Sequence, residues 1–268
     1  MLPKSYKDSP CWLTIDVERL EDANFGITPK KNLSIDYNSL IDLWIDLCNR
    51  YSIKSCAFIL GSFAKEFPDS VKKLANNGHE IASHGLRHEL VYRLTFDQWK
   101  EELIESKKIL EDLTGQEVQG YRSPSWSMPF QKRYYEALIE AGFNFSSSYF
   151  PFKTYMYGNS IDKKTPFNIQ TPSGSITEIP VPKRWIPFSG GFYLRTLPFF
   201  ITKTLFSNLI KHNIKPIIYT HPYELQNNLF SKHLSDVAFD VSYIMTFANS
   251  GDSVKRIEKL LTLAKGTS

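Results

Sequence analysis

The chain has 268 residues, of which 42% are hydrophobic and 14% aromatic, and this is enough apolar material for one large core. Its 32 basic and 28 acidic residues leave a net charge of +4 and are interspersed without a long basic run, so nucleic-acid binding finds no support. The three cysteines are an odd number without a CxxC spacing, which argues against a disulfide scaffold or a cysteine zinc site.

Buried strands and amphipathic helices alternate along the sequence. The apolar residues at 40, 44, 47 and 51 share one helical face, and Thr95 followed by Gln98 has the form of a capping box. Pro68 suits a first helical position, and Gly78 suits a left-handed helix exit. In chain order we predict a strand over 11–16, a helix over 37–51, a strand over 55–60, a helix over 68–77, a strand over 79–83, a helix over 96–115, a strand over 118–121, a helix over 130–141, a short strand over 143–147, hairpins and loops over 152–195, a helix over 198–212, a strand over 215–219 and a helix over 252–264.

Repeated strand and helix units of this size indicate parallel strands with covering helices. Six or more such units in one domain favour a barrel, and no Gly/Ser linker or repeat divides the chain. We therefore predict a single α/β domain over residues 1–268 with a distorted (β/α) barrel. In such barrels the chemistry lies on loops at the carboxyl ends of the strands, where this sequence places Asp16, Glu18, His84, His88, Arg122 and His221.

The segment SHGLRH holds two histidines four residues apart. Gly85 and the strand-like HEIAS before His84 favour a tight loop over a helix. Two neutral imidazoles plus a carboxylate, with positions open to water, form a hydrolytic metal site, because the ion must activate a water and polarise a carbonyl. An isolated HxxxH is more often a pair of surface or hydrogen-bonding histidines.

Asp16 and Glu18 stand two residues apart at the end of a strand. Because alternate residues of a strand point the same way, both carboxylates are expected to face the mouth of the barrel. One would bind the metal while the other takes a proton from the attacking water. The alternative is a pair of solvated loop acids.

Four segments resemble the polysaccharide deacetylases of carbohydrate esterase family 4, namely TIDVE at 14–18, SHGLRHE at 83–89, GYRSPSW at 120–126 and YTHPYE at 219–224. The stretches ELVYR at 89–93 and FSGGFYLRTLP at 188–198 are similar to a bacterial branch of this family found with exopolysaccharide genes. The resemblance implies a barrel with about seven strands and one divalent metal, Zn²⁺ first, with Co²⁺ or Ni²⁺ as alternatives.

The resemblance implies a role for each matching position. Asp16 matches the catalytic base, Arg122 the arginine that orients it, and His221 the general acid for the leaving amine. Ser125 stands where the family places a backbone N–H in the oxyanion hole, with Trp126 beside it as a substrate contact.

His84 and His88 match the two metal-binding histidines, but the first motif departs from the family. Valine stands at position 17, where the usual motif has a metal-binding aspartate, and valine cannot ligate a metal. Some relatives use acids two residues apart, which makes Glu18 the third ligand. The family's aspartate-rich fourth motif is also absent, and only Glu178 and Trp185 lie in its region.

A glycine-rich loop is the predicted substrate contact, because paired glycines allow close backbone approach and its Tyr and Arg can stack on or hydrogen-bond to a sugar. An ordinary glycine-rich turn is the alternative. Its candidate residues are Ser189, Gly190, Gly191, Tyr193 and Arg195.

The expected reaction is the removal of an N-acetyl group from an amino sugar that is nucleotide-linked, lipid-linked or part of an oligosaccharide. The absence of a signal peptide and of a long apolar run predicts a cytoplasmic protein without membrane insertion. Two alternatives stay open, an amidase of the same fold acting on a non-sugar amide or formyl group, and a catalytically silent saccharide-binding relative. A glycosidase using Asp16 and Glu18 is disfavoured, because it leaves the histidines unexplained.

Overall fold

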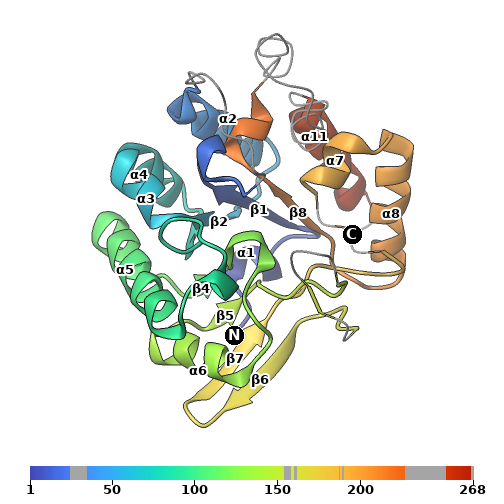
Figure 1. Ribbon diagram of the computed structural model, residues 1–268. Coiled ribbons are helices and arrows are strands. Elements are labelled where there is room, and N and C mark those ends of the chain that lie inside the picture. Colours follow the sequence, from blue (N-terminus) through green and yellow to red (C-terminus); the bar gives the residue numbers. More distant parts are fainter. Residues whose placement is uncertain are drawn as a thin grey trace, which may run out of the picture.

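The computed structural model describes residues 1–24, 35–153, 158–159, 162–186, 188, 190–226 and 252–266. Its centre is a curved sheet of eight strands, in the order β6-β7-β5-β4-β3-β2-β1-β8 (Figure 1). All neighbouring pairs are parallel except β6 with β7. The strands are β1 (Trp12–Val17), β2 (Cys56–Ile59), β3 (Glu80–Ser83), β4 (Gly120–Tyr121), β5 (Phe145–Ser146), β6 (Phe167–Thr171), β7 (Gly174–Glu178) and β8 (Ile217–Thr220).

Helices follow most strands and cover the convex side of the sheet (Figure 1). Short 3-10 turns lie in the loops beyond the carboxyl ends of the strands. The helices are α1 (Lys4–Lys7), α2 (Tyr37–Arg50), α3 (Gly61–Glu66), α4 (Pro68–Asn76), α5 (Phe96–Thr114), α6 (Lys132–Glu140), α7 (Phe192–Thr196), α8 (Phe199–Lys211) and α11 (Asp252–Lys265), and the turns are η1 (Leu20–Asp22), η2 (Val91–Arg93), η3 (Pro124–Trp126) and η4 (Pro222–Leu225).

The two faces of β1 belong to two separate apolar cores. Its odd-numbered residues Leu13, Ile15 and Val17 pack against the helices in the larger core. Its even-numbered side faces the concave interior, where Trp12 packs in a smaller core with residues of β2, β3, β5 and β8. Tyr6 of α1 packs edge-on against Trp12 and closes this interior at its amino-terminal end. At this end of the strands the described residues therefore fill the concave interior with apolar side chains.

Local capping explains several helix boundaries. The capping box of α5 is present with both bonds, Gln98 N–H to the Thr95 hydroxyl (3.2 Å) and Thr95 N–H to the Gln98 side chain (2.9 Å). Gly115 ends this helix in the left-handed conformation at φ 67°. Pro68 opens α4, and Gly78 follows it at φ 76°. These sequence predictions are confirmed.

The predicted distorted barrel with about seven parallel strands is confirmed, with two details added by the structure. The strand β6 is not parallel to the other seven, because it pairs antiparallel with β7 in a hairpin. The sheet of the described residues forms an open half-barrel with β6 and β8 at its edges. The region 152–195, predicted as hairpins and loops, contains this hairpin and also the short helix α7, whose five residues are too few to show a helical period.

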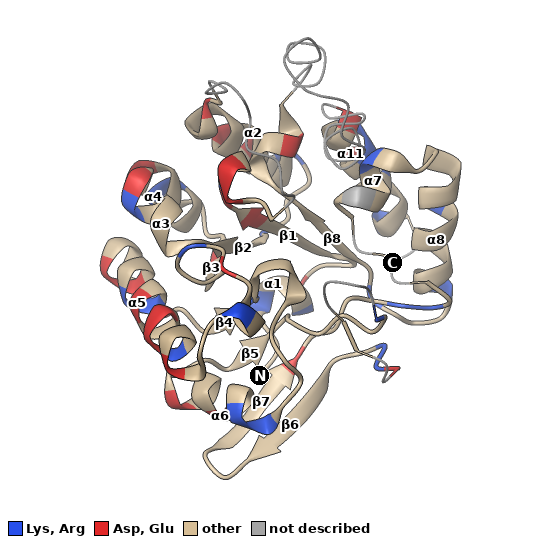
Figure 2. Cartoon of the chain, viewed as in Figure 1, with Lys and Arg blue, Asp and Glu red and all other residues tan. Residues whose placement is uncertain are grey.

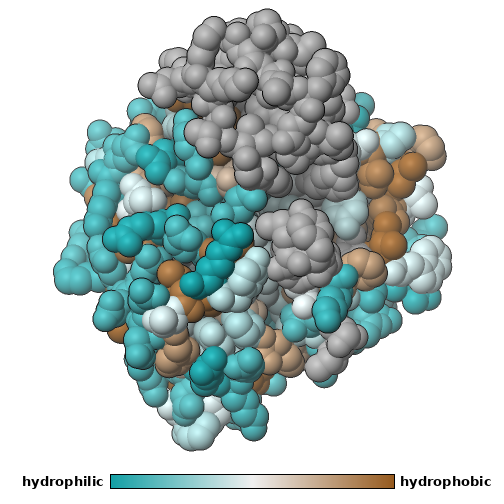
Figure 3. Space-filling view, viewed as in Figure 1, coloured by the Kyte–Doolittle hydropathy of each residue, from teal (hydrophilic) through white to brown (hydrophobic). Residues whose placement is uncertain are grey.

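The surface carries charges of both signs in alternation. Figure 2 shows Lys, Arg, Asp and Glu interspersed along α4 and α5. In Figure 3 apolar side chains gather over α8, where Phe200 is 70% exposed. Within the described residues, none of the helices has the length and apolar character needed to cross a membrane.

Candidate active site

The carboxyl ends of four strands bring the predicted residues together. Asp16 and Glu18 come from the end of β1, and His84 follows β3. Arg122 follows β4, and His221 follows β8, which pairs directly with β1. In Figure 1 these strand ends converge on one rim of the half-barrel. The site therefore combines residues more than 200 positions apart in the sequence.

Strand alternation explains why residue 17 does not enter the site. Val17 belongs to the core between the sheet and the helices, whereas Asp16 bonds to Arg122, which lies on the concave side over the Phe58 ring. Glu18, one residue further on, is again on the side of Asp16 and is buried, with 1% exposure. The alternation of side chains along a strand, with a period of two residues, predicted this arrangement.

Glu18, His84 and His88 form a compact group with metal-binding potential. Their ligand atoms lie within 4.8 Å of one another, and all three residues are buried. Glu18 Oε2 lies 2.7 Å from His88 Nε2 and 3.6 Å from His84 Nε2. Burial alone raises the pKa of Glu18, but the neighbouring His88 and His221 hold this pKa well below its ordinary value. The carboxyl group is therefore an ionised potential ligand.

The hydrogen bond of His84 fixes its tautomer. Its Nδ1 lies 2.8 Å from the carbonyl oxygen of Arg122, which can only accept, so Nδ1 carries the proton. In neutral His84, Nε2 then presents a lone pair to Glu18 Oε2 at 3.6 Å, and the same oxygen lies 2.7 Å from His88 Nε2. Two lone pairs face each other unless a proton or a cation lies between them. These residues therefore fit a divalent metal ion.

Arg122 connects both halves of the site. Its backbone carbonyl orients His84, while its guanidinium donates to Asp16 Oδ1 at 2.5 Å. The same guanidinium donates to Thr14 at 3.1 Å and to Ser147 at 3.2 Å. Asp16 and Arg122 are both nearly fully buried, so water screens their attraction only weakly. The arrangement holds the Asp16 side chain in place.

His221 lies on the other side of Glu18. Its Nε2 is 3.7 Å from Glu18 Oε1, and its Nδ1 is 3.3 Å from Glu224 Oε1. Burial alone lowers the pKa of His221, but the carboxylates of Glu224 and Glu18 raise this pKa to about 9. His221 is thus arranged as a proton donor at neutral pH. Glu224 is itself tied to Arg195 at 2.8 Å.

The loops of the site contain unusual backbone conformations. His88, Ser125 and Trp126 have left-handed φ values of 59°, 48° and 50°, which non-glycine residues rarely adopt. Such conformations persist where surrounding contacts impose them, and they are common at functional sites. SHGLRH is a loop, as predicted, with Gly85 at φ 88°. Trp126 packs edge-on against Tyr219, with ring centroids 5.1 Å apart.

The glycine-rich loop that was predicted to contact the substrate packs against the strand β8. A Cβ on Gly190 would lie 2.5 Å from the carbonyl oxygen of Tyr219, and one on Gly191 would lie 2.5 Å from the Tyr219 ring. Both glycines therefore allow the loop to pack on β8. Tyr193 is partly buried against Phe188. Arg195 is 3% exposed and paired with Glu224, and Ser189 lies outside the described residues.

Three residues that contact the site were given no role from the sequence, namely Asn24, Tyr223 and Glu224. Asn24 holds His88 through its side-chain amide, 3.0 Å from Nδ1 and 3.1 Å from the carbonyl oxygen. Tyr223 donates to Glu18 at 3.1 Å, and Glu224 contacts His221. Tyr223 and Glu224 stand in the YTHPYE segment, which was the available signal. Asn24 precedes a stretch without any motif.

Glu178, from the region of the missing fourth motif, is a buried acid that supports the strand ends beside Arg122. Its Oε1 accepts the backbone N–H groups of Ser148 (2.7 Å) and Tyr149 (3.0 Å). The Ser148 hydroxyl in turn accepts the N–H of Ser123, next to Arg122. Burial raises the pKa of Glu178 from 4.5 to about 7.

This raised pKa predicts a pH-dependent stability. The folded state binds the proton of Glu178 more tightly than the unfolded state, so its contribution is complete below about pH 4.5 and is lost as pH rises through about 7. The free energy of unfolding that Glu178 contributes, on the order of 3 kcal/mol, is lost over this pH range. Glu178→Gln should flatten this slope in urea unfolding at pH 4.5 to 8, whereas exposed Glu101→Gln should keep the wild-type slope. Identical slopes in wild type and Glu178→Gln would contradict the assignment.

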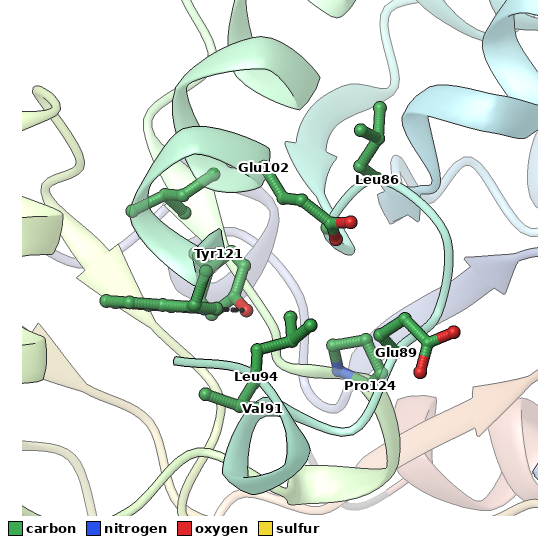
Figure 4. A pocket seen from close by; sticks show the side chains of 10 residues that line it. Leu86, Glu89, Val91, Leu94, Glu102, Tyr121 and Pro124 are labelled. Atoms are coloured by element: carbon green, nitrogen blue, oxygen red, sulfur yellow. Dashed lines mark hydrogen bonds between the residues drawn. The ribbon is translucent and has the colours of Figure 1, made fainter. Parts of the chain in front are cut away.

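A separate pocket is lined by residues of the SHGLRH loop, of the helix α5 and of the strand β4 (Figure 4). Its wall is mostly apolar, with Leu86, Val91 and Leu94 among the lining residues, and Tyr121 and Glu102 border it. None of Glu18, His84 and His88 lines this pocket. The pocket is therefore distinct from the candidate metal site formed by Glu18, His84 and His88.

Two family profiles cover most of the chain between them. The polysaccharide deacetylase profile matches residues 32–146, and a domain of unknown function, DUF3473, matches residues 147–266. A peptidoglycan-N-acetylglucosamine deacetylase of Bacillus cereus is 31% identical over 135 residues, which are 46% of this chain and 49% of the relative. The chain covers only 35% to 49% of the first curated relatives that it matches.

Solved structures share the fold at low sequence identity. One from Mycobacterium smegmatis, assigned to the polysaccharide deacetylases, is 16% identical with a TM-score of 0.59, over 97% of this chain and 91% of that one. A CE4 family pseudoenzyme from Bacillus anthracis is 11% identical with a TM-score of 0.51, over 97% of this chain and 62% of that one. The fold therefore does not by itself decide activity. Profile and curated relatives agree on one likeness: residues 32–146 are similar to the polysaccharide deacetylase family, and the solved structures share the fold of the chain.

Proposed function

We propose that this protein is a metal-dependent hydrolase that removes the N-acetyl group from an amino sugar. The observation that carries the proposal is the convergence of Glu18, His84 and His88, with the tautomer of His84 directing a lone pair at the Glu18 carboxylate. A divalent ion held there would polarise the acetamide carbonyl and lower the pKa of a water molecule. The sequence predicts Glu18, His84 and His88 as the ligands and Zn²⁺ in preference to Co²⁺ or Ni²⁺.

The residues of the chain divide the proton transfers between them. Asp16, positioned by its hydrogen bond from Arg122, is the proposed base that takes a proton from the attacking water. His221, protonated beside Glu224 and Glu18, is the proposed acid that protonates the leaving nitrogen. The backbone N–H of Ser125 is the proposed oxyanion donor. The amine and acetate are then the products.

The silent saccharide-binding alternative was suggested by Val17. In the structure Val17 faces the helices, and Glu18 occupies the concave side with the two histidines. Three buried ligand atoms in one place favour an active metal site over a silent one. A non-sugar amide or formyl group stays the alternative substrate.

We propose further that the chain is one domain over residues 1–268, although the two profiles meet at position 146. β8 pairs with β1, and β5 pairs with β7, so one sheet runs across that boundary. The site also needs both parts, because His221 comes from the second and Glu18 from the first. An exopolysaccharide substrate and a cytoplasmic location stay predictions from the sequence.

The deciding experiment measures acetate release from N-acetylglucosamine oligosaccharides by the purified chain. We expect activity to disappear after removal of metal with a chelator and to return with Zn²⁺ or Co²⁺. Metal content should be measured in parallel. Full activity in metal-free protein contradicts the proposal, and hydrolysis of simple formamides without action on any sugar favours the non-sugar alternative. Sugar binding without acetate release at any metal supports the silent alternative.

A further inference from the structure

Tyr223 is a buried side chain in direct contact with Glu18. It lies in the turn η4, two residues after His221, and is 1% exposed. Its hydroxyl donates to Glu18 Oε1 over 3.1 Å, across 205 positions of sequence. The contact is inside the protein, where water does not compete for the hydrogen bond.

The two oxygens of Glu18 have different partners. Oε1 faces the Tyr223 hydroxyl, whereas Oε2 faces Nε2 of His88 at 2.7 Å and of His84 at 3.6 Å. A hydrogen bond to one oxygen sets the rotation of the carboxylate and so directs the other oxygen at the histidines. Glutamate has one more rotatable bond than aspartate, so its carboxylate needs such a restraint to act as a fixed ligand.

The turn that carries Tyr223 is itself held firmly. Glu224 Oε2 accepts the backbone N–H of His221 (3.1 Å) and the Thr220 hydroxyl (2.9 Å), and Glu224 Oε1 pairs with Arg195 (2.8 Å). The Tyr223 ring also lies parallel to the His221 imidazole, with an interplanar angle of 4° and centroids 5.1 Å apart. Tyr223 thus contacts both the proposed third ligand and the proposed acid.

We propose that Tyr223 is the positioning residue that makes Glu18 an effective metal ligand in a site whose usual aspartate position is Val17. The inference rests on the proposed function, because it requires a metal at Glu18, His84 and His88. It assigns Arg195 to the support of this turn through Glu224, in place of the sugar contact expected from the sequence.

The test is metal affinity, measured by competition with a chromophoric chelator for Zn²⁺ on the purified full chain. Tyr223→Phe keeps the ring and removes the hydroxyl, and it should weaken Zn²⁺ binding about 10- to 100-fold, the usual effect of losing a group that orients a ligand. Tyr121→Phe is the matched control, because Tyr121 is equally buried and its hydroxyl accepts from Trp99 at 3.1 Å, away from Glu18. That variant should bind Zn²⁺ like the wild type.

A second comparison separates positioning of Glu18 from a general loss of order. In a Glu18→Gln background, adding Tyr223→Phe should cost no further Zn²⁺ affinity, because the charged partner is already gone. An equal loss in both backgrounds overturns the inference, as does wild-type affinity in Tyr223→Phe. Failure of the wild-type chain to bind Zn²⁺ at all overturns the proposed function itself, and the inference with it.

Discussion

Replacing Asp16 by asparagine should reduce deacetylation by about 1,000-fold or more, since asparagine cannot take a proton from water and such a base contributes about 10²- to 10⁴-fold. Zn²⁺ affinity should stay within a few-fold of the wild type, because Glu18, His84 and His88 are all retained. Acetate release and a Zn²⁺ titration on the same preparation measure both quantities.

This variant also leaves the Arg122 guanidinium buried without its carboxylate partner. Breaking a buried ion pair is costly, so the thermal midpoint should fall, and activity must be compared below the unfolding transition. Asp46→Asn, at an exposed position of α2, is the matched control and should behave like the wild type. If Asp16→Asn loses Zn²⁺ together with activity, Asp16 is a ligand and the proposed division of roles is wrong.

Replacing Glu18 by glutamine should weaken Zn²⁺ binding by more than the about 100-fold expected for a supporting residue, since a ligand itself is lost. The amide keeps the shape of the side chain but carries no charge. Deacetylation should fall with metal occupancy and recover in part at high Zn²⁺ concentration. Recovery with metal is the feature that separates this variant from Asp16→Asn.

Glu21→Gln is the matched control for this experiment. Glu21 lies three residues further along and is exposed, so its substitution should change neither Zn²⁺ affinity nor activity. Unchanged Zn²⁺ affinity in Glu18→Gln would show that Glu18 is not a metal ligand. The first motif would then supply no replacement for the family's aspartate, whose position Val17 occupies.

Most strands and helices could be predicted because their patterns are local. The helix α5 has its capping box and left-handed glycine within its own sequence, and the strands are short apolar runs between turns. The short helix α7 was missed, because five residues hold too little periodicity. The antiparallel hairpin of β6 and β7 lies in the region 152–195, where the turn residues and short apolar runs predicted hairpins.

The placement of the site followed partly from the same local rules. Period two in β1 predicted that Asp16 and Glu18 share a side and that Val17 does not. The glycine-rich loop was less predictable. Whether Gly190 and Gly191 approach a sugar or a strand depends on what lies opposite them, and in the structure that is Tyr219 of β8.

The sequence by itself determined the strand and helix order, the family motifs and the residue types available for metal binding and proton transfer, because each of these is encoded in short stretches of chain. Only the tertiary structure decided which partners those residues have. β8 lies beside β1, and this neighbourhood brings Tyr223 and His221 to Glu18 and Arg195 to Glu224. Such contacts join positions up to 205 residues apart, and no local pattern of hydrophobicity or charge specifies them.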